Sequence, residues 1–243
     1  MGTSTARKAP TGKFWRRAKA SASRFSSSKN NGQVSAAEVV AGYVTAIKDN
    51  QAAAPIFPQI QQVAGNLGRF YQKLALHGLD QAWRDFGLDE LIGTPMPSTL
   101  PALVDILAGP GAALEAAVAR SALIEILAAG PVSTKDGYFE QRAAKPGEPS
   151  PQTISGRIRN FLAEAVYQKL ASDLGEALEA QAADSWTGAA RLQELRQSIQ
   201  GILPPPDEEI EEFDLSWSDL QSRAWIEAQL QLLLDRLEQG HAF

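Results

Sequence analysis

Few residues of this chain are of the types that perform acid–base, nucleophilic or metal chemistry. The 243 residues include no cysteine and only two histidines, His77 and His241. Without cysteine there is no disulfide, no thiolate zinc or iron–sulfur site and no cysteine nucleophile. The two histidines form no H-x-x-x-H pair, which excludes a histidine-based metal site within one chain. These absences argue against catalysis.

Common nucleotide-binding and hydrolytic motifs are absent as well. Gly109-Pro110-Gly111 precedes an expected helix, but Leu114 stands where a dinucleotide turn needs its third glycine. Gly12-Lys13 is followed by Phe14 in place of the serine or threonine of a phosphate loop, and no G-x-S-x-G sequence occurs. The acidic run 208–212 lacks the alternation of a calcium loop. We therefore expect no cofactor, no bound metal and no enzymatic activity; an enzyme of unrecognised type is the least favoured hypothesis.

Charge is distributed very unevenly along the chain. The formal net charge is −5, yet residues 1–31 carry +8 and no acid, which leaves −13 for the other residues. The cations of this segment are Arg7, Lys8, Lys13, Arg16, Arg17, Lys19, Arg24 and Lys29. A second block, without any base, contains Asp207, Glu208, Glu209, Glu211, Glu212 and Asp214. Such blocks are typical of solvated tails or interaction segments.

Residues 1–33 are small, polar and basic, and few of them can bury apolar surface to offset the entropic cost of ordering. We expect a flexible basic arm there, with one short helix near residues 14–25. No apolar h-region follows the basic N-terminus, and no run of 18 or more apolar residues occurs. We therefore expect a cytoplasmic protein without a membrane segment.

The other residues predict an all-α fold. Ser35-Ala36-Ala37-Glu38 has the pattern of a capping box, in which serine and glutamate each satisfy a backbone N–H at the start of a helix. Apolar residues then recur at helical spacing in successive segments, and strand patterns are nearly absent. The expected organisation is a helical bundle at 34–129, a linker or long loop at 130–152, a long and a short helix at 153–201 that pack on the bundle, an acidic Pro-led spacer at 202–215 and a C-terminal helix at 216–239.

Two interpretations of the basic arm remain open. The mixture of cations and aromatic residues is typical of segments that contact phosphates and stack on bases, as in a nucleic-acid-binding adaptor. An arm of this length could equally bind an acidic protein partner or the acidic block of the chain itself. In the nucleic-acid-binding interpretation, the residues that contact phosphates or bases are Phe14, Trp15, Arg16, Arg17, Lys19 and Arg24.

The N-terminal sequence resembles that of the QatB family. The likeness starts with Met1-Gly2-Thr3-Ser4, continues with Ala9-Pro10-Thr11-Gly12-Lys13 and Trp15, and extends in pattern over most of residues 1–180. Further matching segments are Glu38-Val39-Val40, Gly78-Leu79, Ala82-Trp83, Leu91-Ile92-Gly93, Leu107-Ala108-Gly109 and the helix from Phe161 to Glu179.

The resemblance implies a component of the four-component Qat anti-phage defence system. The partners implied are a QueC-like enzyme (QatC), a P-loop ATPase (QatA) and a TatD-like nuclease (QatD). Because QueC-like defence enzymes are associated with attaching a deazaguanine-type base to a protein N-terminus, the resemblance makes Gly2 the expected acceptor after removal of Met1. The partner-binding residues expected beside it are Thr3, Ser4, Phe14, Trp15, Arg16 and Arg17.

Overall fold

Nine α-helices and one short 3-10 helix follow one another along the described part of the chain, without a strand. The computed structural model describes residues 12–27, 34–50, 55–94, 96–111, 113–129, 154–182, 184–203, 217 and 220–240. The elements are α1 (Lys13–Ser26), α2 (Ala36–Asn50), α3 (Pro58–His77), α4 (Leu79–Asp85), η1 (Asp89–Leu91), α5 (Met96–Ala108), α6 (Leu114–Ala129), α7 (Ile154–Glu179), α8 (Ser185–Gln200) and α9 (Leu220–Gln239). The prediction of an all-α protein is confirmed.

Local signals place several helix ends where the sequence predicts them. Ser35 Oγ accepts a hydrogen bond from the backbone N of Glu38 at 3.2 Å, and Glu38 Oε2 accepts one from the backbone N of Ser35 at 2.7 Å. This is the predicted capping box, and α2 begins directly after Ser35. At the other end of the next helix, Gly78 has φ 76°, a conformation that ends α3 and costs a glycine little.

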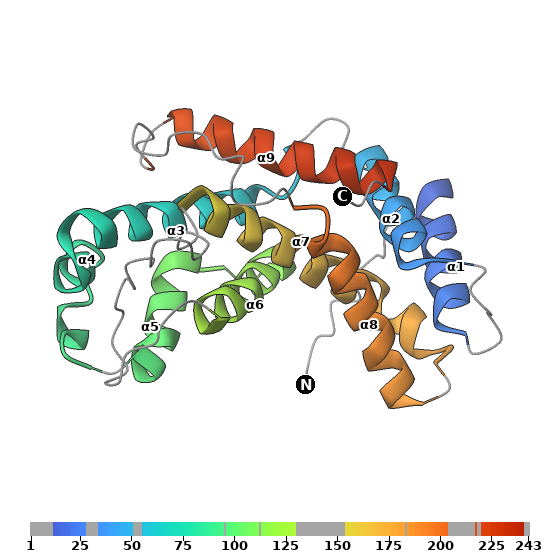
Figure 1. Ribbon diagram of the computed structural model, residues 1–243, viewed down its shortest axis with the longest axis horizontal. Coiled ribbons are helices and arrows are strands. Elements are labelled where there is room, and N and C mark those ends of the chain that lie inside the picture. Colours follow the sequence, from blue (N-terminus) through green and yellow to red (C-terminus); the bar gives the residue numbers. More distant parts are fainter. Residues whose placement is uncertain are drawn as a thin grey trace, which may run out of the picture.

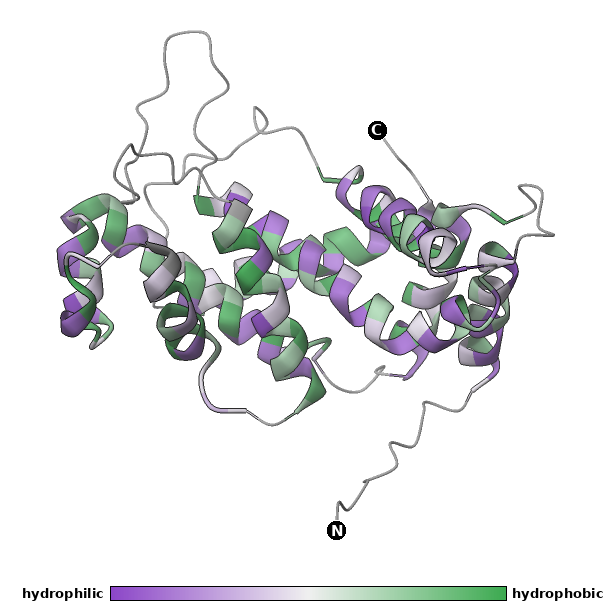
Figure 2. Ribbon diagram, turned by 90° about the horizontal axis from the view of Figure 1, so that it is seen from below, coloured by the Kyte–Doolittle hydropathy of each residue, from purple (hydrophilic) through white to green (hydrophobic). Residues whose placement is uncertain are grey.

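Helix α7 is the central element of the fold and contacts α1, α3, α6, α8 and α9 (Figure 1). All residues from 161 to 166 are buried, because helices cover α7 on several sides. At one end of the molecule α1, α2 and α8 pack together, α3 to α6 form the other end, and α9 runs along both (Figure 1). One continuous cluster of buried apolar residues joins these groups. Most ribbons in Figure 2 alternate between hydrophilic and hydrophobic residues, as amphipathic helices do.

The expectation of a flexible arm over residues 1–33 is wrong for residues 13–26. These residues form α1, and the predicted short helix packs against α2 and α7. A single apolar stripe of Trp15, Ala18, Ala22 and Phe25 is buried. The two alanines have no side chain beyond Cβ, so α1 approaches its neighbours closely and buries enough surface to stay ordered. Residues 1–11 and 28–33 lie outside the described residues.

The other predicted boundaries can be compared with the structure only in part. Helix α8 begins at Ser185, within the predicted range 153–201, where Asp184 caps it by accepting from the backbone N of Thr187 at 2.7 Å. The structure describes the C-terminal helix from Leu220, and residues 216, 218 and 219 of its predicted start lie outside the described residues. The predicted linker at 130–152 and most of the acidic spacer lie outside the described residues. No helix among the described residues is long and apolar enough to cross a membrane.

Candidate functional site

The outer face of α1 carries cations of the basic N-terminal segment. Lys13, Arg16, Arg17 and Arg24 are exposed on it, at a spacing that places them on one side of a helix, and Lys19 lies half-buried at its edge. Helix α1 contains no acidic residue. Among the residues that the structure describes, no carboxylate forms an ion pair with these cations. We call Lys13, Arg16, Arg17 and Arg24 the cationic face.

The inner face attaches α1 to the body of the protein. Ser26 Oγ donates a hydrogen bond to the carbonyl oxygen of Leu178, and Ser23 Oγ donates one to the carbonyl oxygen of Ala177 at 3.4 Å. The guanidinium of Arg191 on α8 lies 4.8 Å from the ring centroid of Phe25. These contacts hold the C-terminal end of α1 against the end of α7 and the start of α8. The cationic face is therefore held in a defined orientation.

Trp15 lies inside the protein, which corrects the prediction that its side chain contacts a partner. Only 6% of its surface is exposed, and its ring centroid lies 5.9 Å from that of Tyr43. The Tyr43 hydroxyl donates to Asp173 Oδ2 at 2.9 Å, and Lys169 forms an ion pair with the same carboxylate. Burial, and next the negative charge of Asp173, raise the pKa of Tyr43 well above its usual value. Trp15 thus belongs to the packing between α1, α2 and α7.

The remaining predicted site residues are placed only in part. Phe14 is half-buried, with Lys13 Nζ 5.7 Å from its ring centroid, so its outer edge is accessible. Arg16 and Arg17 are exposed. Gly2, Thr3 and Ser4 lie outside the described residues, as does His241.

The described residues contain no cluster of three or more histidine, aspartate or glutamate side chains that could hold a metal ion. A small pocket lies between α7, the end of α8 and α9, lined by Arg159, Leu162, Ile202, Leu203, Gln229, Leu232, Leu233 and Arg236. The polar side chains of this lining are two arginines and one glutamine, without a histidine, a carboxylate or a hydroxyl group. The pocket can present guanidinium groups to a polar ligand but has no general acid or base.

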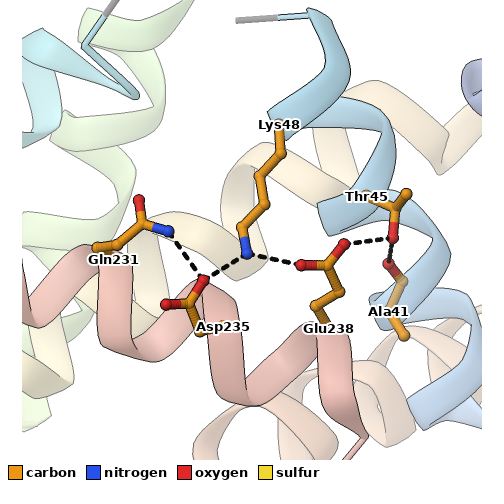
Figure 3. A network of polar contacts seen from close by, with 6 residues as sticks. All are labelled: Ala41, Thr45, Lys48, Gln231, Asp235 and Glu238. Atoms are coloured by element: carbon orange, nitrogen blue, oxygen red, sulfur yellow. Dashed lines mark hydrogen bonds and ion pairs between the residues drawn. The ribbon is translucent and has the colours of Figure 1, made fainter. Parts of the chain in front are cut away.

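A polar network joins α2 to α9 (Figure 3). Lys48 Nζ lies 2.5 Å from Asp235 Oδ1 and 2.7 Å from Glu238 Oε2. The Thr45 hydroxyl lies 2.9 Å from Glu238 Oε1, and Gln231 Nε2 donates to Asp235 at 2.8 Å. The hydrogen bonds from Lys48 lower the pKa values of both carboxylates. Since α2 packs along α1, this network also supports the helix that carries the cationic face.

Sequence reasoning missed this network for a clear reason. Its acidic and basic members are separated by 187 and 190 residues, and each is an ordinary surface residue of its own helix. The i, i+4 spacing of Gln231 and Asp235 is a weak local signal, but it contains no information about Lys48.

The fold and this surface define an all-α protein whose described part includes a helix with exposed cations on one side. Residues 49–231 match the family model described as Qat anti-phage system associated protein QatB. The chain therefore belongs to the QatB family, as the resemblance of its sequence indicated, and is a component of the Qat anti-phage system. No curated protein and no solved structure matches the chain.

The matched segment does not include the whole packed structure. It begins after Lys48 and ends before Asp235, so that α1, most of α2 and the last turns of α9 lie outside it. The network of Figure 3 joins these parts directly, because both of its ion pairs link a residue before the matched segment to one after it. The network thus joins α2 to the last turns of α9, whereas the contacts of α1 with Leu178 and Arg191 reach residues inside the matched segment.

Proposed function

We propose that this chain is a non-enzymatic subunit of the Qat system that binds a QueC-like enzyme and accepts a deazaguanine-type conjugate on the α-amine of Gly2. The observation that carries the proposal is the attachment of α1. Its first turn at Lys13 is held to the body by the buried Trp15, and the chain before it contains Gly2. The N-terminal segment therefore joins the described structure at a defined point, the start of α1.

The chemistry of Gly2 suits an acceptor. Glycine is small enough to allow removal of Met1, and it has no side chain that would hinder attack by its amine. An α-amino group has an unperturbed pKa of about 8, so a useful fraction is neutral and nucleophilic at physiological pH. The lone pair of this neutral amine is what a conjugating enzyme requires from its substrate.

The partner contacts that we propose follow the chain from the acceptor to the helix. Thr3 and Ser4 supply hydroxyl and backbone hydrogen-bonding groups next to Gly2. Arg16 and Arg17 supply exposed charge on α1, and the half-buried Phe14 supplies an apolar edge. The QueC-like enzyme (QatC) is the direct partner in this proposal, with the P-loop ATPase (QatA) and the TatD-like nuclease (QatD) as further members of the assembly.

Intact mass of the protein after co-expression with its neighbouring genes tests the proposal. The expected result is a mass increase, located on the N-terminal peptide, that requires the QueC-like enzyme. Gly2→Leu should abolish it, because a large second residue prevents removal of Met1, whereas Gly2→Ala keeps a free α-amine and serves as the conservative comparison. An N-terminus that is unmodified glycine under all of these conditions contradicts the proposal.

A nucleic-acid-binding adaptor is the second candidate, and the cationic face favours it, because its cations are exposed and form no ion pair with a carboxylate that the structure describes. The burial of Trp15 and Phe25 weakens it, since neither ring can stack on a base. Phosphate contacts alone would make binding strongly dependent on salt. Variants with Arg16, Arg17 and Lys19 changed to glutamate should then lose this binding; unchanged affinity removes the candidate.

A further inference from the structure

We propose that the pocket between α7, α8 and α9 is a binding site for the acidic block of the same chain, residues 207–214. The carboxylates of the block pair with Arg159 and Arg236, and the side chain of Ile210 enters the apolar part of the pocket. This site belongs to the body of the protein and is independent of the function proposed above for the N-terminus.

The first argument is the chemistry of the pocket. Its polar side chains are Arg159, Arg236 and Gln229, and no carboxylate of the described residues lines it. Arg159 Nε donates to Gln229 Oε1 at 3.1 Å, which orients the guanidinium. The other lining residues are leucines and an isoleucine, and Leu232 among them is 41% exposed. A ligand that fits this lining combines negative charge for the guanidinium groups with an apolar side chain for the leucines.

The second argument is the position of the two ends of the segment that contains the acidic block. Leu203, the last described residue before the block, is itself part of the pocket lining. Trp217, the next described residue after the block, is buried, and its ring centroid lies 5.4 Å from that of Trp225. The guanidinium of Arg159 lies 5.7 Å from the centroid of the same Trp225 ring. Arg159 therefore lies near both ends of the segment.

The length of this segment keeps the acidic block close to the pocket. Residues 204–216 are tethered at both ends, and Ile210 is seven residues from Leu203 and seven from Trp217. Seven residue steps extend over at most about 25 Å. Tethering at so short a range gives the carboxylates a high effective concentration at the arginines. Ion pairs that are individually weak are therefore sufficient to hold the block on the pocket.

The third argument is the pattern of residues within the block. Glu208, Ile210 and Glu212 stand at every second position. In an extended chain such residues point to the same side and are about 7 Å apart. An extended block therefore presents one apolar side chain between two carboxylates, which is the combination that the pocket lining requires. A nucleic acid would supply the negative charge but no aliphatic side chain.

Disulfide cross-linking of the full-length protein tests the site without background, because the sequence contains no cysteine. The first pair is Ile210→Cys with Leu232→Cys, at the exposed edge of the pocket. Two cysteines can form a disulfide only when their Cα atoms come within about 7 Å. We expect an intramolecular disulfide to form in dilute protein under mild oxidation.

The matched control pair is Ile210→Cys with Leu76→Cys. Leu76 is 61% exposed and lies eight residues, or about 12 Å, along α3 from Gly68, against which Trp217 packs. The same tether can therefore reach it. We expect this pair to form its disulfide at least about tenfold more slowly, because no ion pairs hold the block there. Equal rates for the two pairs would overturn the site.

The arginines distinguish binding from random sampling by a tethered chain. Arg159→Gln with Arg236→Gln should slow the first cross-link about tenfold, the effect of two partly exposed ion pairs. Arg16→Gln with Arg17→Gln makes the same charge change on the cationic face and should alter the rate less than about twofold. A wild-type rate in the first variant refutes the site, and a slower rate only in the second shows that the block binds the cationic face instead.

Changes within the block give a second measurement that does not depend on the folding of the arginine variant. Glu208→Gln with Glu212→Gln should slow the first cross-link about tenfold as well. Glu209→Gln with Glu211→Gln removes the same charge from the opposite side of an extended chain and should have a smaller effect. Equal effects of these two variants, or a disulfide that forms only between two chains, would contradict the proposal.

Discussion

Gly68 on α3 leaves the space that Trp217 occupies, and we predict that Gly68→Ala destabilises the protein by displacing this ring. A Cβ atom at Gly68 would lie 2.2 Å from Cε3 of Trp217 and 2.5 Å from its Cδ2. Trp217 is 4% exposed and packs edge-on against Trp225, with ring centroids 5.4 Å apart. Neither the helix backbone nor the packed ring can move away by the required distance without breaking these contacts.

The magnitude follows from two opposing effects. Alanine in place of glycine inside a helix stabilises by about 0.5–1 kcal/mol. Loss of a buried large aromatic side chain costs about 3–5 kcal/mol. We therefore expect a net loss of about 2–4 kcal/mol in the free energy of unfolding for Gly68→Ala. Gly175→Ala on α7 is the matched control, since no atom lies within 4 Å of its Cβ position, and it should stabilise by about 0.5–1 kcal/mol.

Denaturant unfolding of four proteins measures the effect: wild type, Gly68→Ala, Trp217→Ala and the double variant. If the cost arises from the contact between these two residues, Gly68→Ala should become neutral or stabilising once Trp217 is alanine. An equal cost of Gly68→Ala in both backgrounds, or stabilisation of the wild-type background, refutes the reasoning.

Two further predictions concern contacts between distant helices. Lys48→Met should cost about 1 kcal/mol, because both ion pairs are partly exposed and each is worth about 0.2–1 kcal/mol. Folding lowers the pKa values of Asp235 and Glu238. The stability that these carboxylates contribute is therefore present above their unfolded pKa values of about 4 and is lost as the pH falls through their folded pKa values. In urea unfolding, the difference in the free energy of unfolding between wild type and Lys48→Met should be constant near neutral pH and disappear in acid. Glu115→Ala should cost about 1–2 kcal/mol and speed hydrogen exchange in the first turn of α3, because Glu115 Oε1 accepts from the backbone N atoms of Gln59 at 2.6 Å and Ile60 at 3.1 Å. Exchange at wild-type rates in that turn would contradict this account of the cap.

Helices and their ends depend largely on residues that are close together in the sequence, and these were predictable. Ser35 and Glu38 are three residues apart, and they start α2 through contacts with each other. The apolar positions of α7 recur at helical spacing, from which its length could be read. The start of α8 likewise depends on a local contact, in which Asp184 accepts from the backbone N of Thr187.

The candidate site was predictable only as a set of residues. Composition identified the cations of the N-terminal segment, and the resemblance identified the family. Neither could show that Trp15 is buried while Arg16 and Arg17 are exposed, because a stripe of four apolar residues is too short to predict packing without knowledge of the opposite surface. That surface is supplied by α2, α7 and α8.

The amino-acid sequence by itself determined the helical class, the absence of cysteine chemistry and the concentration of positive charge in the first 31 residues. These properties depend on composition and on interactions between near neighbours in the chain. Tertiary structure alone decided that α1 is part of the core, that Trp217 fits against Gly68 and that Lys48 pairs with Asp235 and Glu238. The physical reason is that each of these contacts joins residues that are far apart in the sequence. Such a contact stabilises the protein only when both of its helices are already in place.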